Sequence, residues 1–151
     1  MLAIVTTTST DRAWAVFVAR AILGVVFLVA GIYKVFMWGP LEHAATLFVK
    51  PYADTFLPVW SLWLTGAAVP VLELVCGALV LVGLATRPAL FVLGAILVLV
   101  TFGHLLLQPS TSINPFILPR SALLLIVVFF PATADRFSLD ALLWRRTQVR
   151  D

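Results

Sequence analysis

One acidic residue lies in the middle of a long apolar run, and it is the strongest candidate for chemistry in this sequence. Glu73 is halfway along the stretch from Leu62 to Leu84, which carries no other charge. An ionised carboxylate at the centre of a bilayer is costly unless it is paired, so an acid at that depth is expected to serve a function. We therefore consider Glu73 a candidate for accepting or donating a proton.

A proline precedes this acid by about one helical turn. Pro70 has no backbone N–H, so within a helix it leaves the carbonyl of Gly66 without its usual donor. Such a gap is tolerated in a membrane helix when another group satisfies the carbonyl. We expect the helix to kink beside Glu73.

Four other ionisable side chains fall within the apolar runs: Arg20, Lys34, His104 and Arg120. At ~1.5 Å per residue, Glu73 lies about 16 Å from either end of its run, and Arg20 lies roughly 9 Å inside its own. The long Arg20 side chain is therefore expected to reach towards Glu73. A lone acid among several bases is most simply paired and ionised.

These residues also have purely structural interpretations. Lys34 and Arg120 are close enough to span ends for their charged heads to extend to the membrane surface. His104 fits the apolar packing of a helix. A pair between Arg20 and Glu73 would by itself fix helix register without any catalytic role.

The functional interpretation is a pocket on the outer side of the membrane. Glu73, His104 and Arg120 would converge there beneath the segment 37–61, offering an acid, hydrogen-bond donors and apolar walls. Such a pocket suits a quinone headgroup or a small anion. Two histidines and one membrane glutamate are too few and too scattered for a haem or di-metal site, so we expect no metal or haem.

The composition requires these side chains to be positioned by membrane helices. The chain has 151 residues, of which 62% are hydrophobic and 11% charged, which excludes an ordinary soluble domain. The apolar runs lack the alternating polarity of barrel strands. We predict an all-α fold with a single domain over residues 1–151, an up-down bundle of four transmembrane helices. The expected spans cover residues 14–36, 62–84, 89–107 and 115–130.

Two segments outside the spans carry helical patterns. Residues 37–61 mix polar and apolar side chains, and we expect a short interfacial helix between the first two spans. Its expected apolar face contains Leu41, Ala44, Leu47 and Phe48. Residues 135–151 predict an amphipathic helix with Leu139, Leu142 and Leu143 on one face, and with arginines that suit anionic headgroups.

The distribution of arginine predicts the orientation. All the arginines outside the spans lie in the two tails or in the turn at Arg87, so the positive-inside rule places both termini in the cytoplasm. The net charge of +3 therefore reflects membrane topology, and no nucleic-acid partner is expected. The single cysteine, Cys76, excludes an internal disulfide and a CxxC pair. The spacing of Gly24 and Gly31 would allow one stripe of close helix packing.

Several stretches together resemble a known family. The first span reads Arg20-Ala-Ile-Leu-Gly24 and later Ala30-Gly31-Ile-Tyr-Lys34, the second contains Pro70-Val-Leu-Glu73 and ends in Gly83-Leu-Ala-Thr86-Arg87, and the third ends near His104. This combination is similar to the DoxX family of small bacterial inner-membrane proteins, in a wider group that includes DoxD-like and MauE-like proteins. The resemblance covers roughly residues 14–130.

The resemblance implies a four-helix membrane bundle in the bacterial inner membrane. The membrane subunit of an archaeal thiosulfate:quinone oxidoreductase is similar to this family, and other relatives mature periplasmic redox enzymes or belong to membrane oxidoreductase complexes. The family's motif positions are Arg20, Lys34, Glu73 and His104 here. The paired cysteines of a thiol relay are missing, which argues against direct disulfide chemistry.

Two functions remain open from the sequence. The first is a membrane component of a redox system that exchanges electrons with the quinone pool, a quinone-linked oxidoreductase subunit. Glu73 and His104 would be catalytic, and Arg20, Lys34 and Arg120 would help bind the quinone. The second is a non-catalytic scaffold or assembly factor for a redox enzyme. Both require the lipid bilayer and a partner subunit or a second copy of the chain.

Overall fold

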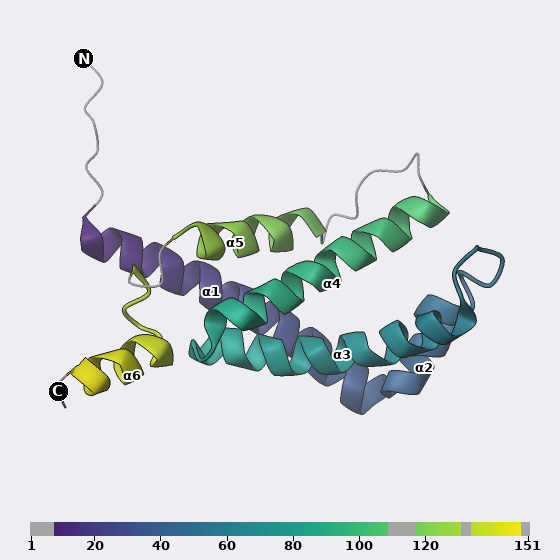
Figure 1. Ribbon diagram of the computed structural model, residues 1–151, viewed down its shortest axis with the longest axis horizontal. Coiled ribbons are helices and arrows are strands. Elements are labelled where there is room, and N and C mark those ends of the chain that lie inside the picture. The colour runs from purple at the N-terminus through teal and green to yellow at the C-terminus, as the bar shows by residue number, and fades with distance from the viewer. Residues whose placement is uncertain (1–7, 109–116, 131–133, 149–151) are drawn as a thin grey trace, which may run out of the picture.

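The chain is helical throughout the part that the structure describes. The computed structural model describes residues 8–108, 117–130 and 134–148, with side chains up to residue 143. No strand occurs within these ranges. The helices pack side by side as an elongated bundle, and the C-terminal helix lies beyond one end of it (Figure 1).

Among the described residues, three helices are long and apolar enough to cross a bilayer, so the chain is a multi-pass membrane protein. The first consists of α1 (Ser9–Ile32) and its π-helical continuation η1 (Tyr33–Trp38), and the others are α3 (Val59–Val82) and α4 (Thr86–Leu107). The fourth expected span contains α5 (Ile117–Phe129), which is apolar but has only 13 residues. The described part of the chain therefore contains three helices of span length and one shorter apolar helix.

Glycines bring α1 and α3 into close antiparallel contact. A Cβ at Gly24 would lie 2.7 Å from the backbone of Leu81, and one at Gly31 would meet the backbone of Leu74. From the other side, Gly77 faces Leu28 in the same register. The predicted glycine stripe of α1 is thus confirmed, and it fixes which residues of the two helices lie opposite each other.

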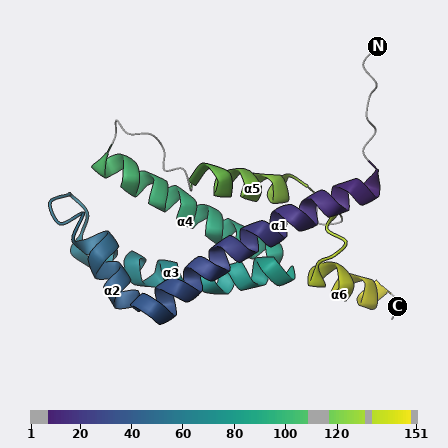
Figure 2. The ribbon, with the colours of Figure 1, turned by 180° about the vertical axis from the view of Figure 1, so that it is seen from behind.

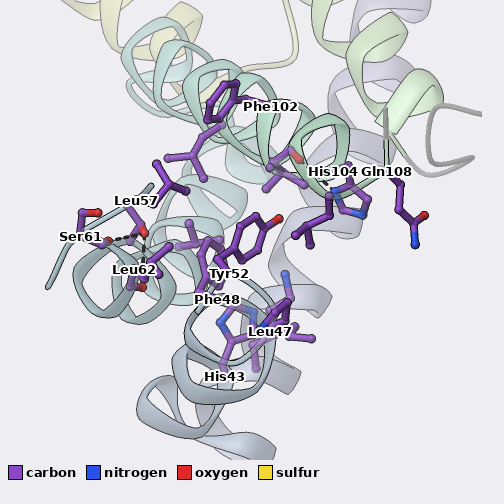
Figure 3. Close-up of a pocket in the computed structure, with 18 residues that line it drawn as sticks. His43, Leu47, Phe48, Tyr52, Leu57, Ser61, Leu62, Phe102, His104 and Gln108 are labelled. Atoms are coloured by element: carbon purple, nitrogen blue, oxygen red, sulfur yellow. Dashed lines mark hydrogen bonds between the residues drawn. The ribbon is translucent and has the colours of Figure 1, made fainter. Parts of the chain in front are cut away.

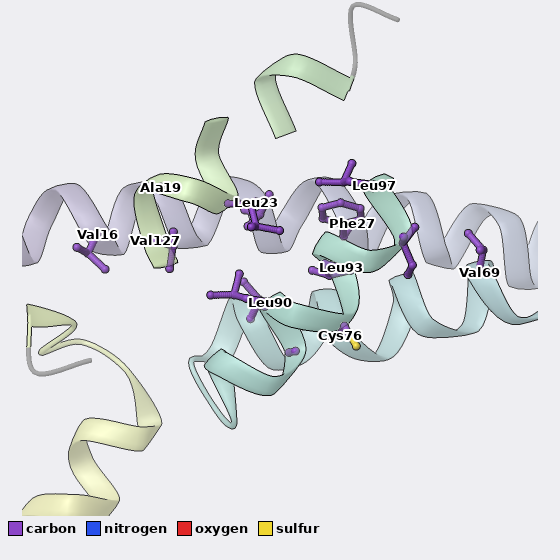
Figure 4. Close-up of a cluster of buried hydrophobic side chains, with 14 residues drawn as sticks. Val16, Ala19, Leu23, Phe27, Val69, Cys76, Leu90, Leu93, Leu97 and Val127 are labelled. Atoms are coloured by element: carbon purple, nitrogen blue, oxygen red, sulfur yellow. The ribbon is translucent and has the colours of Figure 1, made fainter. Parts of the chain in front are cut away.

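The buried core lies where α1, α3, α4 and α5 meet (Figure 4). Leu23, Phe27 and Leu93 are at most 1% exposed there. Outward-facing positions are equally apolar, such as Val29 at 58% exposure and Val98 at 71%. Apolar side chains on both the inside and the outside of a bundle are typical of helices that contact lipid.

The segment between the first two long helices folds back against α3 (Figure 2). It contains α2 (Pro40–Ala44) and the π-helical η2 (Ala45–Val49). A Cβ at Gly66 of α3 would lie 2.7 Å from Ala44, so only a glycine allows this contact. The segment is thus helical, as expected; His43 and Ala44 face the protein and are buried, whereas Leu41 and Leu47 of the expected apolar face are exposed. The polar His43 side chain faces the protein interior because the exterior of a bundle in a membrane is apolar.

Different elements meet at the two ends of the bundle, which we name after Lys34 and Arg20. At the Lys34 end, η1, α2 and η2 gather around the start of α3 and the end of α4. At the Arg20 end, α1 and α4 begin, α3 ends, and α6 (Leu139–Gln148) follows (Figure 1). The predicted face of α6 is exposed, since Leu139, Leu142 and Leu143 are 41–52% accessible.

Candidate functional site

A cavity of about 640 Å³ opens at the Lys34 end of the bundle (Figure 3). The first half of α3, the second half of α4 and the segment that follows α1 form its walls. Most of the lining is apolar, with Leu47, Phe48, Leu62, Phe102 and Leu107 among its residues. A few polar side chains interrupt this surface, which is the usual composition of a small-molecule site.

Lys34 brings a charge to this cavity, and Glu73 lies directly behind it. Lys34 Nζ donates a hydrogen bond to Glu73 Oε2 over 2.5 Å. The Glu73 side chain is 4% exposed and that of Lys34 is 25% exposed. Glu73 itself therefore does not line the cavity but contacts Lys34, which does. The ion pair joins η1 to α3.

This pairing corrects the expectation that Arg20 would reach Glu73. The glycine contacts place Arg20 opposite the last turn of α3, far along the helix from Glu73. There the guanidinium donates to the carbonyls of Val80 and Leu81, each over 2.7 Å. Depth in the membrane suggested the wrong partner for Glu73, because the register between α1 and α3 decides which of their residues meet.

Arg20 is part of a separate polar cluster at the end of the bundle opposite the cavity. Its Nε lies 2.9 Å from Asp135 Oδ2, and the side chain is 1% exposed. Burial raises the pKa of Asp135, while the Arg20 guanidinium opposes that rise. This cluster ties the segment before α6 to the ends of α1 and α3.

The same end is joined by a second carboxylate. Asp140 accepts hydrogen bonds from the backbone N–H groups of Ala85 (2.9 Å) and Thr86 (3.0 Å), and its own N–H donates to Gly83 O. Gly83 has φ +74° and would meet Ser138 if it carried a Cβ. Asp140 thereby caps the first turn of α4 and fixes α6 against the turn between α3 and α4.

His43 lines the cavity and satisfies the carbonyl that Pro70 leaves open. Its Nδ1 lies 2.8 Å from Gly66 O. The residue is 2% exposed. Because a carbonyl only accepts, Nδ1 must carry the proton and donate it. Burial lowers the pKa of His43, so the ring is held in its neutral form.

Tyr52 occupies the middle of the cavity, above His43 (Figure 3). Its hydroxyl lies so close to Gly103 that a Cβ there would be 2.5 Å from the oxygen. Burial raises the pKa of Tyr52, so the phenol keeps its proton. Gly103 of α4 is therefore needed for Tyr52 to sit where it does.

The remaining predicted site residues are divided between the cavity and the bundle core. His104 lines the cavity and directs Nδ1 to Val100 O of its own helix at 2.9 Å. Arg120 does not line it; its guanidinium carbon lies 5.5 Å from the centre of the Phe27 ring. The structure thus brings Lys34, Glu73 and His104 together and leaves Arg20 and Arg120 elsewhere.

His43 and Tyr52 were not predicted as site residues. The sequence did contain one signal for His43, because the carbonyl freed by Pro70 requires a donor from another element. Tyr52 had no such signal, since its place depends on how the segment 37–61 folds back. Within the described residues, no cluster of three metal-ligating side chains occurs.

The cavity offers hydrogen-bond donors at one end and an apolar volume at the other. The donors include the Lys34 ammonium and the Tyr52 hydroxyl, and the neutral His43 ring adds an acceptor. Such a site suits a ligand with a small polar headgroup and an apolar body. The lysine pair and the phenol also supply protons that can be exchanged with a bound headgroup.

Comparison with protein families gives a match to the DoxX family over residues 15–105. This range contains Lys34, His43, Tyr52 and Glu73 and reaches His104, so it includes most of the cavity. It confirms the resemblance noted from the sequence. No curated protein and no solved structure matches the chain.

Proposed function

The chain belongs to the DoxX family, and on that premise we propose that it is a membrane component of a redox system linked to the quinone pool. The observation that carries this proposal is the cavity at the Lys34 end. A quinone combines a flat ring bearing carbonyl oxygens with an apolar tail. The cavity pairs a few polar groups with apolar walls, and about 640 Å³ is within the range of cofactor sites.

In this proposal, donors at the polar end of the cavity bind the headgroup oxygens. Lys34 Nζ and the Tyr52 hydroxyl line the cavity and carry transferable protons. Glu73 holds Lys34 in place and stabilises its charge. His104, on the cavity wall, provides a further polar contact. Arg20 and Arg120 do not line this cavity, so in this proposal they contribute to the packing of the helices and do not contact the headgroup.

In this proposal the cavity lies towards one side of the membrane, and the chain acts with a partner subunit. The arginine-rich Arg20 end faces the cytoplasm, following the positive-inside rule, which places the cavity towards the outer side of the inner membrane. A bound quinone exchanges electrons with another centre, and we assign that centre to a partner subunit. The alternative, a scaffold that only holds such a partner, requires no quinone in the cavity.

Quinone content tests the proposal directly. The protein is purified in mild detergent, and quinone per protein is measured after solvent extraction for wild type and Gly103→Leu. Gly94→Leu is the matched control on the same helix, because a Cβ there meets nothing nearer than 3.8 Å. We expect near-stoichiometric quinone in wild type and in the control, and a severalfold loss in Gly103→Leu. Wild-type quinone no higher than in an unrelated membrane protein would refute the proposal and leave the scaffold.

A further inference from the structure

His43 presents a hydrogen-bond acceptor to the cavity. Its Nδ1 donates to Gly66 O, so in the neutral ring Nε2 carries a lone pair and no proton. The tautomer is fixed by α3, because Pro70 cannot satisfy that carbonyl. Among the residues that the structure describes, no group donates a hydrogen bond to Nε2, and His43 lines the cavity.

The surroundings of His43 keep this acceptor neutral. The ring is 2% exposed and packs between Trp38 and Phe48, with ring centroids 6.3 and 5.7 Å away. The charged groups that act on it are Lys34, which disfavours a second proton, and Glu73, which favours one. Burial is the largest influence and lowers its pKa. The site therefore combines one acceptor that is accessible from the cavity with nearby donors.

The oxidised and reduced forms of a quinone differ in whether they can donate a hydrogen bond to Nε2 of His43. The carbonyl oxygens of the oxidised form can accept from Lys34 and Tyr52, but they leave His43 Nε2 unpaired. A hydroxyl of the reduced form can donate to Nε2 while its oxygen accepts from a neighbouring donor. A ligand that covers Nε2 without donating to it leaves a buried polar group without a partner, which is costly, so the site favours the ligand that donates.

We propose that His43 makes this cavity selective for a hydroxyl-bearing headgroup, so that it binds a quinol more tightly than the corresponding quinone. This inference rests on the proposed function, since it specifies which form of the ligand the cavity prefers. His43 acts as a specificity-determining residue through Nε2 and as a positioning residue through Nδ1.

Binding of matched ligands tests the selectivity. The full-length protein in detergent is titrated, without oxygen, with a short-chain ubiquinone, its quinol, and the dimethyl ether of that quinol, which has a similar shape and cannot donate. We expect the quinol to bind about tenfold more tightly than either of the others. The matched variant is His43→Asn, whose Nδ2 can still donate to Gly66 O and whose one remaining acceptor, Oδ1, does not occupy the position of Nε2. It should bind all three ligands with similar affinity.

The outcomes separate this inference from the proposed function. Equal binding of quinone and quinol to wild type would overturn the selectivity and leave quinone binding intact, whereas no binding of any ligand would overturn both. Nitrogen NMR of labelled histidine gives a readout that does not depend on the variant. The chain has two histidines, so His104→Gln assigns the signals. We expect His43 to be protonated at Nδ1 alone, and a proton on Nε2 would contradict the inference.

Discussion

Lys34 of η1 and Glu73 of α3 form an ion pair, although they are 39 positions apart in the sequence. The register set by Gly24, Gly31 and Gly77 makes this pairing possible. The charged lysine faces the cavity while the carboxylate is sealed behind it. One interaction therefore links the packing of the bundle to the chemistry of its cavity.

The two halves of this pair should respond differently to substitution. Lys34→Met leaves an almost fully buried carboxylate without a partner, and breaking a buried pair in this way costs about 3–5 kcal/mol. Glu73→Gln should cost less, because the Lys34 side chain is 25% exposed and its charge can still reach water. Thermal unfolding in detergent measures both. The double variant should recover part of the loss of Lys34→Met; a double variant as unstable as the sum of the two would contradict the pairing.

The hydrogen bond between His43 and Gly66 should depend on Pro70. His43→Leu removes the donor to a buried carbonyl, and we expect a loss of about 1–3 kcal/mol in the free energy of unfolding. In a Pro70→Ala background the new backbone N–H can satisfy Gly66 O, so the same substitution should cost less. A double-mutant cycle measures this coupling. A cost of His43→Leu that is unchanged by Pro70→Ala would show that the carbonyl is not what the ring satisfies.

The buried carboxylate of Asp135 should make stability depend on pH. Burial raises the pKa of Asp135 above its usual value of 3.8, so the unfolded chain loses this proton at lower pH than the folded chain does. Between the two pKa values, the unfolded state therefore binds fewer protons, and the Asp135 contribution to stability falls as pH rises. Asp135→Asn should remove this slope, as measured by denaturant unfolding over a pH series.

A matched variant separates this effect from general charge removal. Asp54 lies in the exposed loop before α3, far in sequence from the Arg20 cluster. Asp54→Asn should therefore leave the slope of stability against pH unchanged. If both variants flatten the slope equally, or if Asp135→Asn leaves it intact, the account of Asp135 is wrong.

Much of the fold follows from the sequence, because apolar runs and glycine spacing are local patterns. The long helices, the close contact at Gly31 and the carbonyl freed by Pro70 could all be predicted in this way. The ion pairs could not, since depth along separate spans does not reveal which faces of two helices meet. Depth placed Arg20 beside Glu73, whereas the register placed Lys34 there.

The cavity was harder to predict than the helices. Its position below the segment 37–61 was expected, and Lys34 and His104 are on its wall. The inward turn of His43 was missed because amphipathic patterns assume a polar exterior, and in a membrane the exterior is apolar. The position of Tyr52 depends on the tertiary contact with Gly103, which no local pattern encodes.

Close packing at Gly31 should be intolerant of even one methyl group. A Cβ there meets the backbone of Leu74, which cannot move away without shifting α3. We expect Gly31→Ala to destabilise the bundle by about 1–3 kcal/mol, in the range of overpacked cores. Gly94→Ala, where an added Cβ makes ordinary contact with Leu124, should be nearly neutral. Equal stability of the two variants would contradict the glycine-based register.

Photochemical cross-linking with a quinone probe shows whether a quinone occupies the cavity at the Lys34 end. The full-length protein is irradiated with a photoreactive short-chain quinone, and the modified peptides are identified by mass spectrometry, with and without excess unmodified quinone. We predict competed labelling within residues 43–65 and 99–108, and its loss in Gly103→Leu. Labelling confined to the lipid-facing surfaces, with no competition by unmodified quinone, would contradict a quinone site at the Lys34 end.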